Sequence, residues 1–346
     1  MRILSVGPFS SNNGNNTSSH RNYWLKHYSD YLCEVDSASK WNLWTKVCYK
    51  LICCGISINL PDNASVNKRI IEQFKSAVYD IVWIDKGNTI FPSTLKTIKE
   101  MNPNCILVHY MIDDFMNPYH RTKQIIDTIP LYDYYIVNRT INISELRRYG
   151  CKHPIHVYMT YESLFHFPRP ISVDSISRLG GDLGFIGTYE KERAESMLYL
   201  AENGLKIRIW GNGWKRMKDK NNNLMIEDKG LYSENYCYAI CAFKINLAFL
   251  RKKSRDLHTT RSSEIPACGG FMIAERTSEH LAMFEEDKEA VFFSSNEDLL
   301  EKCRYYLEHE EERSAIAEAG RKRCLSSDYS NDAMIGGVLK LIMTVS

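Results

Sequence analysis

The sequence has no excess of charge of either sign, no long apolar run and no paired cysteine motif. Its 44 basic and 42 acidic residues nearly cancel, which excludes the strong cationic field of a dedicated nucleic-acid binder and the acidic excess of a solvating tail. The best apolar runs, at residues 51–60 and 334–345, are short and interrupted, whereas a bilayer-spanning helix needs about 20 apolar residues. We therefore expect neither a nucleic-acid-binding protein nor a membrane-spanning one.

Cysteine usage excludes a zinc site and a disulfide framework. The eleven cysteines are odd in number and none is spaced as Cys-x-x-Cys. Neither the adjacent pair Cys53 and Cys54 nor the pair Cys237 and Cys241 fits a four-ligand zinc pattern. The first apolar run, within MRILSVGPF, is too short for a signal-peptide core and is typical of a strand. These features predict buried thiols in a reducing, cytoplasmic compartment.

What the sequence does contain is an alternation of short apolar runs with longer stretches of helical spacing. Strands are predicted in the first half at residues 3–6, 80–84, 105–110 and 134–137, and helices at 17–31, 64–78, 92–101 and 140–149. Short runs that are apolar on both faces are typical of strands buried in a parallel sheet. The stretch 168–182, which has two prolines and a glycine pair but no apolar period, predicts a linker.

The same alternation restarts at residue 183. Strands are predicted at 183–187, 206–210, 244–248, 270–274 and 290–293, and helices at 190–203, 297–308, 311–324 and 329–343. In the last helix one apolar stripe predicts docking on a domain surface, with a membrane-surface helix as the alternative. The fold class is therefore α/β, with doubly wound parallel-sheet domains at 1–170 and 171–325 and a C-terminal helix, 326–346, that packs back on them.

The segment DLHTTRSSEIPACGG, residues 256–270, is the most informative about chemistry. A helix that begins near Thr259 offers free N–H groups and a positive dipole end to a diphosphate, and Arg261 in its first turn adds a charged fork. Glu264, about a turn and a half deeper, can accept both hydroxyls of a ribose. Asp256, before the helix, would lie beside a transferred sugar. The structural alternative is a capping aspartate, a solvent-facing Arg261–Glu264 pair and a glycine stop.

The block RSSEIPACGGFMIAERTSEHLAMF, followed by EDLLEKCRYYLEHEEERSAIAEAGRKRC, resembles the carboxyl-terminal signature of GT-B glycosyltransferases, specifically the CgeB-like group. Upstream, DLGFIGTYEKERAESMLYLAENGLKIRIWGNGW resembles the start of the same donor domain. The segments VHYMIDDFMNPY, DYYIVNRTINISELRRYG and TYESLFHFPRP resemble that group's amino-terminal half. The resemblance implies a GT-B fold, in which two Rossmann-like domains face a cleft, and transfer of a sugar from a nucleotide diphosphate sugar such as a UDP-sugar.

The resemblance also implies roles for single residues. Retaining GT-B enzymes carry a Glu-x7-Glu motif, and this chain has Asp256 and Glu264 at its two positions, so inversion and retention both stay open. Glu264 would bind the donor ribose, and the turn of His258, Thr259, Thr260 and Arg261 would bind the diphosphate. Such transferases need no bound metal or other cofactor, because a helix dipole and cationic side chains stabilise the leaving diphosphate.

Two further turns follow predicted strands where a donor would bind. Small and hydroxyl residues in the first turn can approach a phosphate closely. In the second turn, a glycine leaves room for the nucleotide base. Either turn can equally be a plain chain reversal. The predicted donor contacts are Gly187, Thr188, Tyr189, Arg193, Trp210 and Gly211. The cationic cluster 251–255, directly before Asp256, would help to neutralise a diphosphate or form a solvated loop.

On the acceptor side, Asp113 and Asp114 follow a predicted strand. Adjacent carboxylates raise each other's pKa, which favours a proton-transfer role toward the acceptor hydroxyl, and the alternative is a capped turn. Lys86 and His20 are further acceptor-side candidates, with a solvent-facing or capping role as the alternative for His20. The loop 7–14 lacks the dinucleotide fingerprint, and we expect it to face donor or acceptor.

We therefore expect a cytoplasmic glycosyltransferase whose acceptor is a glycan, a lipid-linked glycan or a protein, and whose association with a membrane, if any, is peripheral. Two alternatives stay open. One is a sugar-nucleotide epimerase on the same fold, and the other is a catalytically silent nucleotide-sugar-binding protein.

Overall fold

The computed structural model describes residues 1–11 and 16–345 and divides the chain into two compact units. The first comprises Met1–Tyr158, Lys253–Arg255 and Met334–Ser346, and the second comprises Met159–Lys252 and Asp256–Ala333. The main chain thus passes from the first unit to the second before the predicted linker. That stretch instead carries a short helix of the second unit, α7 (Val173–Leu179), which begins at a Ser172 cap.

The first unit is built on six parallel strands in the order β2-β1-β3-β4-β5-β6. The strands are β1 (Arg2–Gly7), β2 (Tyr31–Asp36), β3 (Ile81–Asp85), β4 (Ile106–Met111), β5 (Tyr134–Val137) and β6 (His153–His156). The helices are α1 (Thr17–His27), α2 (Leu43–Cys53), α3 (Val66–Ser76), α4 (Pro92–Met101), α5 (Lys123–Thr128), α6 (Thr140–Arg148) and α14 (Asn331–Val345), with a 3-10 turn at Ile129–Leu131.

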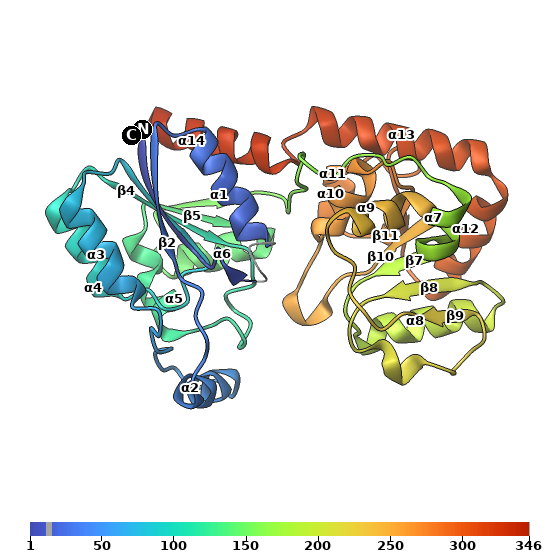
Figure 1. Cartoon of the computed structure of the whole chain (residues 1–346), viewed down its shortest axis with the longest axis horizontal. Coiled ribbons are helices and arrows are strands. Elements are labelled where there is room, and N and C mark those ends of the chain that lie inside the picture. The colour runs from blue at the N-terminus through green and yellow to red at the C-terminus, as the bar shows by residue number, and fades with distance from the viewer. Residues whose placement is uncertain (12–15, 346) are drawn as a thin grey trace. The chain divides into compact units, whose positions relative to one another are not determined.

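Helices cover both faces of this sheet (Figure 1). On one face, α3, α4 and α5 bury Ile70, Leu95 and Ile125 against the strands. On the other face, α1 and α14 pack against Ile3 and Trp83. The stripe of α14 is buried there, as its spacing predicts, and consists of Met334, Ile335, Val338, Leu339 and Ile342. Two-sided burial explains why the inner strands β3, β4 and β5 are apolar in nearly every position.

An ion pair lies inside this unit at the carboxyl end of β3. Arg21 Nε donates to Asp85 Oδ2 over 2.7 Å, and Arg21 Nη2 donates to Asp85 Oδ1 over 3.0 Å. Ser18 Oγ donates to the same Asp85 Oδ1 over 2.8 Å. The Arg21 guanidinium stacks on the Tyr110 ring, 4.1 Å from its centroid. Both charged side chains are almost wholly buried, at 2% and 3% exposed. Each charge therefore depends on the other to offset the free-energy cost of its removal from water.

The second unit repeats the plan with strands in the order β12-β11-β10-β7-β8-β9, all parallel. The strands are β7 (Gly181–Ile186), β8 (Ile207–Trp210), β9 (Leu224–Ile226), β10 (Phe243–Ala248), β11 (Met272–Glu275) and β12 (Val291–Phe293). The helices after α7 are α8 (Lys191–Glu202), α9 (Ser233–Ala242), α10 (Thr260–Ala267), α11 (Ser278–Met283), α12 (Asn296–Glu308) and α13 (Glu310–Ser326), with 3-10 turns at Trp214–Met217 and Lys252–Ser254.

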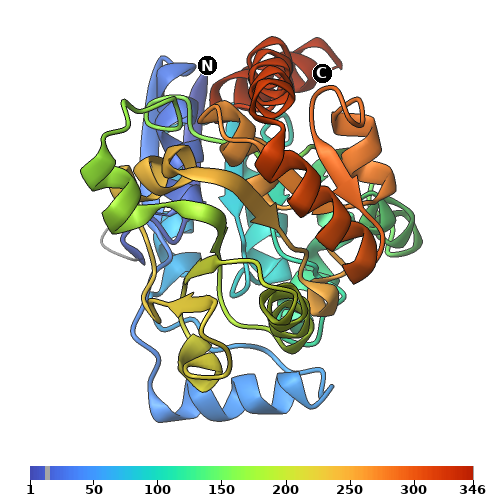
Figure 2. The same cartoon turned by 90° about the vertical axis from the view of Figure 1, so that its right-hand side faces the viewer.

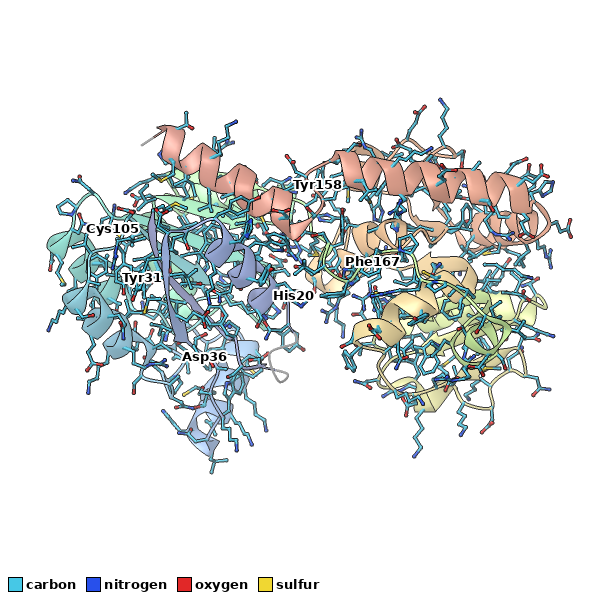
Figure 3. The ribbon with its side chains drawn as sticks, turned by 45° about the horizontal axis from the view of Figure 1, so that its top comes forward. His20, Tyr31, Asp36, Cys105, Tyr158 and Phe167 are labelled. Carbon is cyan, nitrogen blue, oxygen red and sulfur yellow. The ribbon has the colours of Figure 1, made fainter. Side chains whose placement is uncertain are left out.

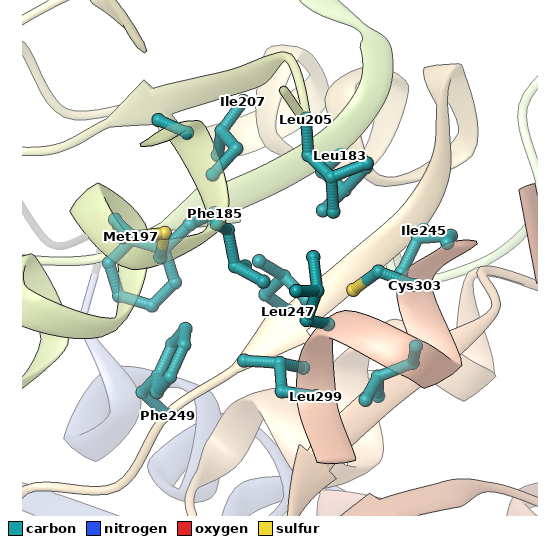
Figure 4. Packing of buried hydrophobic residues seen from close by; sticks show 14 of the residues in the cluster. Leu183, Phe185, Met197, Leu205, Ile207, Ile245, Leu247, Phe249, Leu299 and Cys303 are labelled. Carbon is teal, nitrogen blue, oxygen red and sulfur yellow. The ribbon is translucent and has the colours of Figure 1, made fainter. Parts of the chain in front are cut away.

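The core of the second unit lies between this sheet and helices α8 and α12 (Figure 4). Phe185 of β7 and Leu247 of β10 meet Met197 of α8 and Leu299 of α12. On the other face, Asn246 Nδ2 donates to the carbonyl oxygen of Ile240 in α9 over 3.0 Å. Because every strand is parallel, the loops that follow β7, β8 and β10 emerge at one edge of the sheet, which is where α/β sheets bind ligands.

Two general properties of the chain are visible in the structure. All eleven cysteines are free thiols, and seven of them are buried. Within the described residues, no helix combines the length and the apolar content that crossing a membrane requires.

Candidate functional site

A cavity of about 180 Å³ lies at the carboxyl edge of the second sheet. Its walls come from the end of β7 and the turn after it, from the end of β10, and from the first residues of α10. The lining residues are Phe185, Ile186, Gly187, Thr188, Arg193, Ala248, Phe249, Arg251, Thr259 and Arg261. Three of these ten residues are arginines and none is acidic, so the cavity favours an anionic group.

The turn after β7 is held by backbone contacts with the turn after β8. The Gly187 N–H donates to the Trp210 carbonyl over 2.8 Å, and Trp214 Nε1 donates to the Gly187 carbonyl over 2.8 Å. Gly211 has φ +150°, and a Cβ atom there would lie 1.8 Å from the Gly187 oxygen. Only glycine permits this approach, so the predicted turns of Gly187 and Gly211 form one structure.

Arg193, on the first turn of α8, joins two walls of the cavity. Its guanidinium donates to the carbonyl oxygens of Thr188 over 3.1 Å, Phe249 over 3.3 Å and Leu250 over 3.3 Å. Burial lowers the pKa of Arg193 from its ordinary value, but an arginine stays protonated. The residue therefore fixes the loops after β7 and β10 relative to each other and adds positive charge to the cavity wall.

The first turn of α10 contributes the third wall. The Thr259 N–H donates to Ser262 Oγ over 3.0 Å. The N–H groups of Thr260 and Arg261 precede the first intrahelical donor, the Ser262 N–H, which donates to the Thr259 carbonyl over 3.0 Å, so they have no acceptor within the helix. Arg261 Nε donates to the Ile186 carbonyl over 3.3 Å, and Arg261 Nη1 donates to Thr260 Oγ1 over 3.0 Å. Within the described part of the chain, Arg261 Nη2 has no partner. Helix dipole and guanidinium together form an anion site.

Glu264 lies one turn deeper in α10 and is connected to the cavity through Arg261. Its Oε2 accepts a hydrogen bond from the Tyr236 hydroxyl over 2.5 Å and lies 3.4 Å from Arg261 Nη1. His166 Nε2 is 4.0 Å from its Oε1. Burial would raise the pKa of Glu264, but the Arg261 charge and the Tyr236 hydrogen bond outweigh it and lower the pKa. The carboxylate is therefore ionised and can accept hydroxyl hydrogen bonds.

His258, predicted to contact a diphosphate, is buried in the protein instead. Its Nε2 accepts the Met159 N–H over 2.7 Å, and its Nδ1 lies 2.6 Å from Glu279 Oε2. These partners assign the proton to Nδ1. Both ring nitrogens are thus used within the second unit, and the imidazole positions the turn before α10 rather than a ligand.

The remaining candidates of this unit frame the cavity without lining it. Trp210 is buried and its Nε1 donates to the Leu179 carbonyl over 3.1 Å. Tyr189 packs edge-on against Trp214, with ring centroids 5.3 Å apart. Asp256 is also buried, and its N–H donates to the Arg251 carbonyl over 3.4 Å.

In the first unit, the structure brings two acceptor-side candidates together. Lys86 Nζ lies 3.6 Å from Asp113 Oδ2, and His120 Nδ1 lies 3.8 Å from the same oxygen. Lys86 has φ +68°, an uncommon backbone conformation for a residue with a side chain. His20 lies in the first turns of α1 and is half-buried (Figure 3). Part of the predicted loop 7–14, residues 12–15, lies outside the described residues.

Asp114 departs from the expected raised pKa. The side chain is buried, and Arg255 donates from Nε to Oδ2 and from Nη2 to Oδ1, each over 2.6 Å. Asn142 Nδ2 donates to Oδ1 over 3.1 Å. Burial would raise the pKa of Asp114, but these charged and neutral hydrogen bonds hold it below its ordinary value. The prediction of a raised pKa is therefore wrong for Asp114, and Arg255 binds it and Glu145 rather than a diphosphate.

This cluster predicts a pH dependence of stability. Asp114 and Glu145 both have lowered pKa values, so their contribution is complete above the unfolded pKa, about 4, and is lost as pH falls below it. Arg255→Gln removes the fork from a buried carboxylate, and we expect it to lower the free energy of unfolding by about 2 kcal/mol at pH 7. Because both carboxylates protonate in acid, the difference from the parent should shrink below about pH 4. Urea denaturation across pH measures it.

The matched control is Arg178→Gln, which breaks the exposed pair with Asp174 on α7. An exposed pair contributes little, so this variant should follow the parent at every pH. A constant difference between Arg255→Gln and the parent down to acid pH would contradict the titration of Asp114 and Glu145.

Several residues at this site were missed from the sequence. Tyr236 lies 28 residues before Glu264 and His166 lies much farther away, so no local spacing connects them with α10. Phe249, directly after β10, was also missed, although its place after a predicted strand at the carboxyl edge was a usable signal.

A larger hollow of about 600 Å³ lies elsewhere in the second unit. Its walls include Phe243 and Lys244 at the start of β10 and Phe271 just before β11. It therefore opens at the amino ends of the strands, away from the loops where parallel sheets bind ligands. Within the described residues, no group of three or more His, Cys, Asp or Glu side chains is arranged to hold a metal ion.

Solved structures share the fold of the whole chain. HepE from Anabaena, crystallised in complex with UDP and glucose, matches with a TM-score of 0.67 at 12% identity, over 99% of this chain and 100% of that one. Sucrose-phosphate synthase from Thermosynechococcus elongatus matches with a TM-score of 0.66 at 10% identity, over 100% of both chains. A glycosyltransferase from Rickettsia africae matches with a TM-score of 0.60 at 12% identity, over 98% and 97%.

The predicted fold class is thereby confirmed, with two parallel six-stranded sheets flanked by helices as in GT-B structures. No curated protein matches the sequence. Residues 193–339 match the family model described as Glycosyl transferase-like. That segment contains Arg193, Arg251, Arg261 and Glu264, which line or adjoin the cavity. Residues 193–339, which make up most of the second unit and the first part of α14, are thus glycosyltransferase-like in sequence, and the GT-B fold extends over the whole chain.

Proposed function

We propose that this protein is a glycosyltransferase that takes a sugar from a nucleotide diphosphate sugar, with UDP as the nucleotide carrier, and transfers it to a glycan, lipid-linked or protein acceptor. The observation that carries the proposal is the position of Arg261 in the first turn of α10, at a cavity that three arginines line and no acid enters. The Glycosyl transferase-like match and the nucleotide and sugar in the HepE complex support the same substrate class. Within the GT-B glycosyltransferases, we propose that this chain belongs to the CgeB-like group.

The donor diphosphate would occupy the cavity. The N–H groups of Thr260 and Arg261 and the positive end of α10 would face its oxygens. Arg261 would donate from Nη2, and Arg251 would add charge from the loop after β10. These groups stabilise the negative charge that develops on the diphosphate as its bond to the anomeric carbon breaks. We propose on this ground that transfer proceeds without a bound metal or other cofactor.

Glu264 would bind the donor ribose. An ionised carboxylate has acceptor sites for two hydroxyls in addition to the hydrogen bond that Tyr236 donates. Arg261 joins the two subsites because it faces the cavity and lies 3.4 Å from Glu264 Oε2. A nucleoside diphosphate would therefore engage both residues, whereas inorganic phosphate would need Arg261 alone.

On the acceptor side, Asp113 stays our candidate for the group that removes the hydroxyl proton as the new glycosidic bond forms. The Lys86 ammonium lies 3.6 Å from Asp113 Oδ2. Asp114 is a weaker candidate because Arg255 and Asn142 already use its oxygens. Asp256 stays a candidate for the carboxylate beside the transferred sugar, and the stereochemical outcome follows from which of these groups contacts it.

A thermal-shift screen over UDP-, GDP-, dTDP- and CDP-sugars tests the donor assignment. A ligand at a hundred times its Kd stabilises the folded state by about 2.7 kcal/mol, and we expect the UDP-sugars to raise the melting temperature of the parent by several degrees. Glu264→Ala should lose most of this shift. Glu318→Ala, an exposed glutamate on α13 that pairs with Lys322, should keep it. An equal shift in parent and Glu264→Ala would contradict the ribose assignment.

Product analysis then separates the three functions. A transferase releases the nucleoside diphosphate and extends an acceptor, or hydrolyses the donor slowly when no acceptor is present. An epimerase returns a changed nucleotide sugar without releasing the diphosphate. Donor binding with neither product across glycan, lipid-linked and protein acceptors would favour the silent binding protein.

A further inference from the structure

Helix α2 of the first unit exposes a stripe of large apolar side chains. Leu43 is 79% exposed and Trp44 is 63% exposed, and Val47 and Leu51 are exposed as well. Leu43, Val47 and Leu51 follow one another at a spacing of four and Trp44 lies beside them, so they occupy one face of the helix. Figures 1 and 2 both show α2 below the strands of its own unit.

The opposite face of α2 already holds the helix in place. Cys48 and Ile52 are buried with Leu60 in a small apolar cluster, and Thr45 is buried beside them. Asn42 caps the helix by accepting the Thr45 N–H over 2.8 Å. The outer stripe is therefore not needed for folding, and its exposure to water costs free energy unless another surface covers it.

The charges around the stripe indicate what that surface is. Residues 37–61 contain three lysines and neither aspartate nor glutamate. Lys46 and Lys50 are exposed and adjoin the apolar stripe on the helix surface. Trp41 precedes the helix and is exposed, with its ring 4.9 Å from that of Tyr49. Apolar side chains flanked by lysines, with tryptophan at the edge, match the boundary between the headgroups and acyl chains of an anionic bilayer.

A second copy of the chain fits this face less well. In a two-fold dimer the same surface meets itself, which would bring the lysines of both copies together without an acidic residue of 37–61 to oppose them. The C-terminal helix, the other apolar candidate of the sequence, has its stripe buried in the first unit.

We propose that α2 is an interfacial anchor that binds the surface of an anionic phospholipid bilayer through Leu43, Trp44, Val47 and Leu51, with Lys46 and Lys50 on the headgroups. The proposal goes beyond the proposed transferase function, because it concerns where the protein acts and not what it transfers. It would place the acceptor at a membrane surface.

Vesicle flotation of the full chain tests the anchor. The probes are phosphatidylcholine vesicles with and without phosphatidylglycerol, at low and high salt. We expect the parent to float at least about tenfold more with the anionic vesicles and to lose part of this binding at high salt. Leu43→Ser/Trp44→Ser should lower partitioning about tenfold or more. Lys46→Gln/Lys50→Gln should lower it about thirtyfold on anionic vesicles only.

Matched controls come from the same unit. Val78→Ser changes an apolar side chain that is 68% exposed outside α2, and Lys68→Gln/Lys75→Gln removes two exposed lysines of α3. Both should float like the parent. All variants should show the thermal unfolding of the parent, because the changed side chains are exposed.

Three results would overturn the proposal: a parent that does not float with anionic vesicles, α2 variants that float like the parent, or a parent dimer in sedimentation that Leu43→Ser/Trp44→Ser converts to monomer without any flotation. The last would assign the face to a second copy. Nucleotide binding, which depends on residues of the second unit, is measured separately, so failure of the anchor and failure of the donor site are distinguishable.

Discussion

We expect the Arg261→Ala protein to bind a nucleoside diphosphate about a hundredfold more weakly than the parent. A charge-assisted hydrogen bond contributes about 1.5–3 kcal/mol, and Arg261 is the cavity arginine in the first turn of α10, whose amino end lines the cavity. Because the same charge would stabilise the leaving diphosphate, turnover should fall about a hundredfold to a thousandfold. Isothermal titration with UDP and steady-state release of UDP from the donor measure the two effects.

Arg261→Lys is the matched variant. It keeps the charge but loses the fork, so its affinity should lie between those of parent and alanine variant. Arg178→Ala, an exposed arginine of the same unit, should behave like the parent. Arg261 also compensates the buried Glu264, so titrations are run well below the melting temperature of each variant. If the folded Arg261→Ala protein bound UDP as tightly as the parent, the assignment of the cavity as the diphosphate site would be wrong.

The second large effect is on stability. Asp85→Asn leaves the buried Arg21 without its counter-charge, and removal of one partner from a buried ion pair costs about 3–5 kcal/mol. We expect the first unit to lose that much unfolding free energy. Because the two units can unfold separately, native-state hydrogen exchange of the β1 and β3 amides, which pair with each other, reports on the first unit directly.

Two comparisons make this prediction specific. Glu72→Gln breaks the exposed Lys68–Glu72 pair on α3 and should change stability by less than about 1 kcal/mol. The double variant Arg21→Met/Asp85→Leu removes both charges and should be closer to the parent than Asp85→Asn is. A loss of less than about 1 kcal/mol in Asp85→Asn would show that the pair contributes no more than a surface contact.

The sequence predicts those elements whose pattern reflects burial. The strand 134–137 and the helix 92–101 are observed with the predicted bounds, as β5 and α4, because a strand buried on both faces is apolar throughout and α4 begins at a proline. The edge strand β2 was missed because only one of its residues, Val35, is buried. Helix α2 was missed because apolar side chains lie on its outer as well as its inner face, so its sequence does not show one apolar stripe opposite a polar face.

For the candidate site too, some features were predictable from the sequence and others were not. The start of α10 and the two glycine turns follow from local signals, namely a hydroxyl residue before a helix and glycines after strands. Contacts between distant segments do not: Arg255 is 141 residues from Asp114. Contacts of this kind decide which charged side chains are used inside the protein and which are left to bind a ligand. In this protein, Arg255 and His258 bind other protein groups, and Arg261 lines the cavity.

The return of α14 to the first unit makes the second unit an insertion between two pieces of the first. A fragment that ended at residue 158 would lack the helix that covers Ile3, Trp83 and Val108, and it would expose that sheet face to water. During synthesis the same face stays open until α14 is made, so the first unit cannot mature before the second has been translated. Recombinant halves would need residues 334–346 supplied in trans or fused by a short connector.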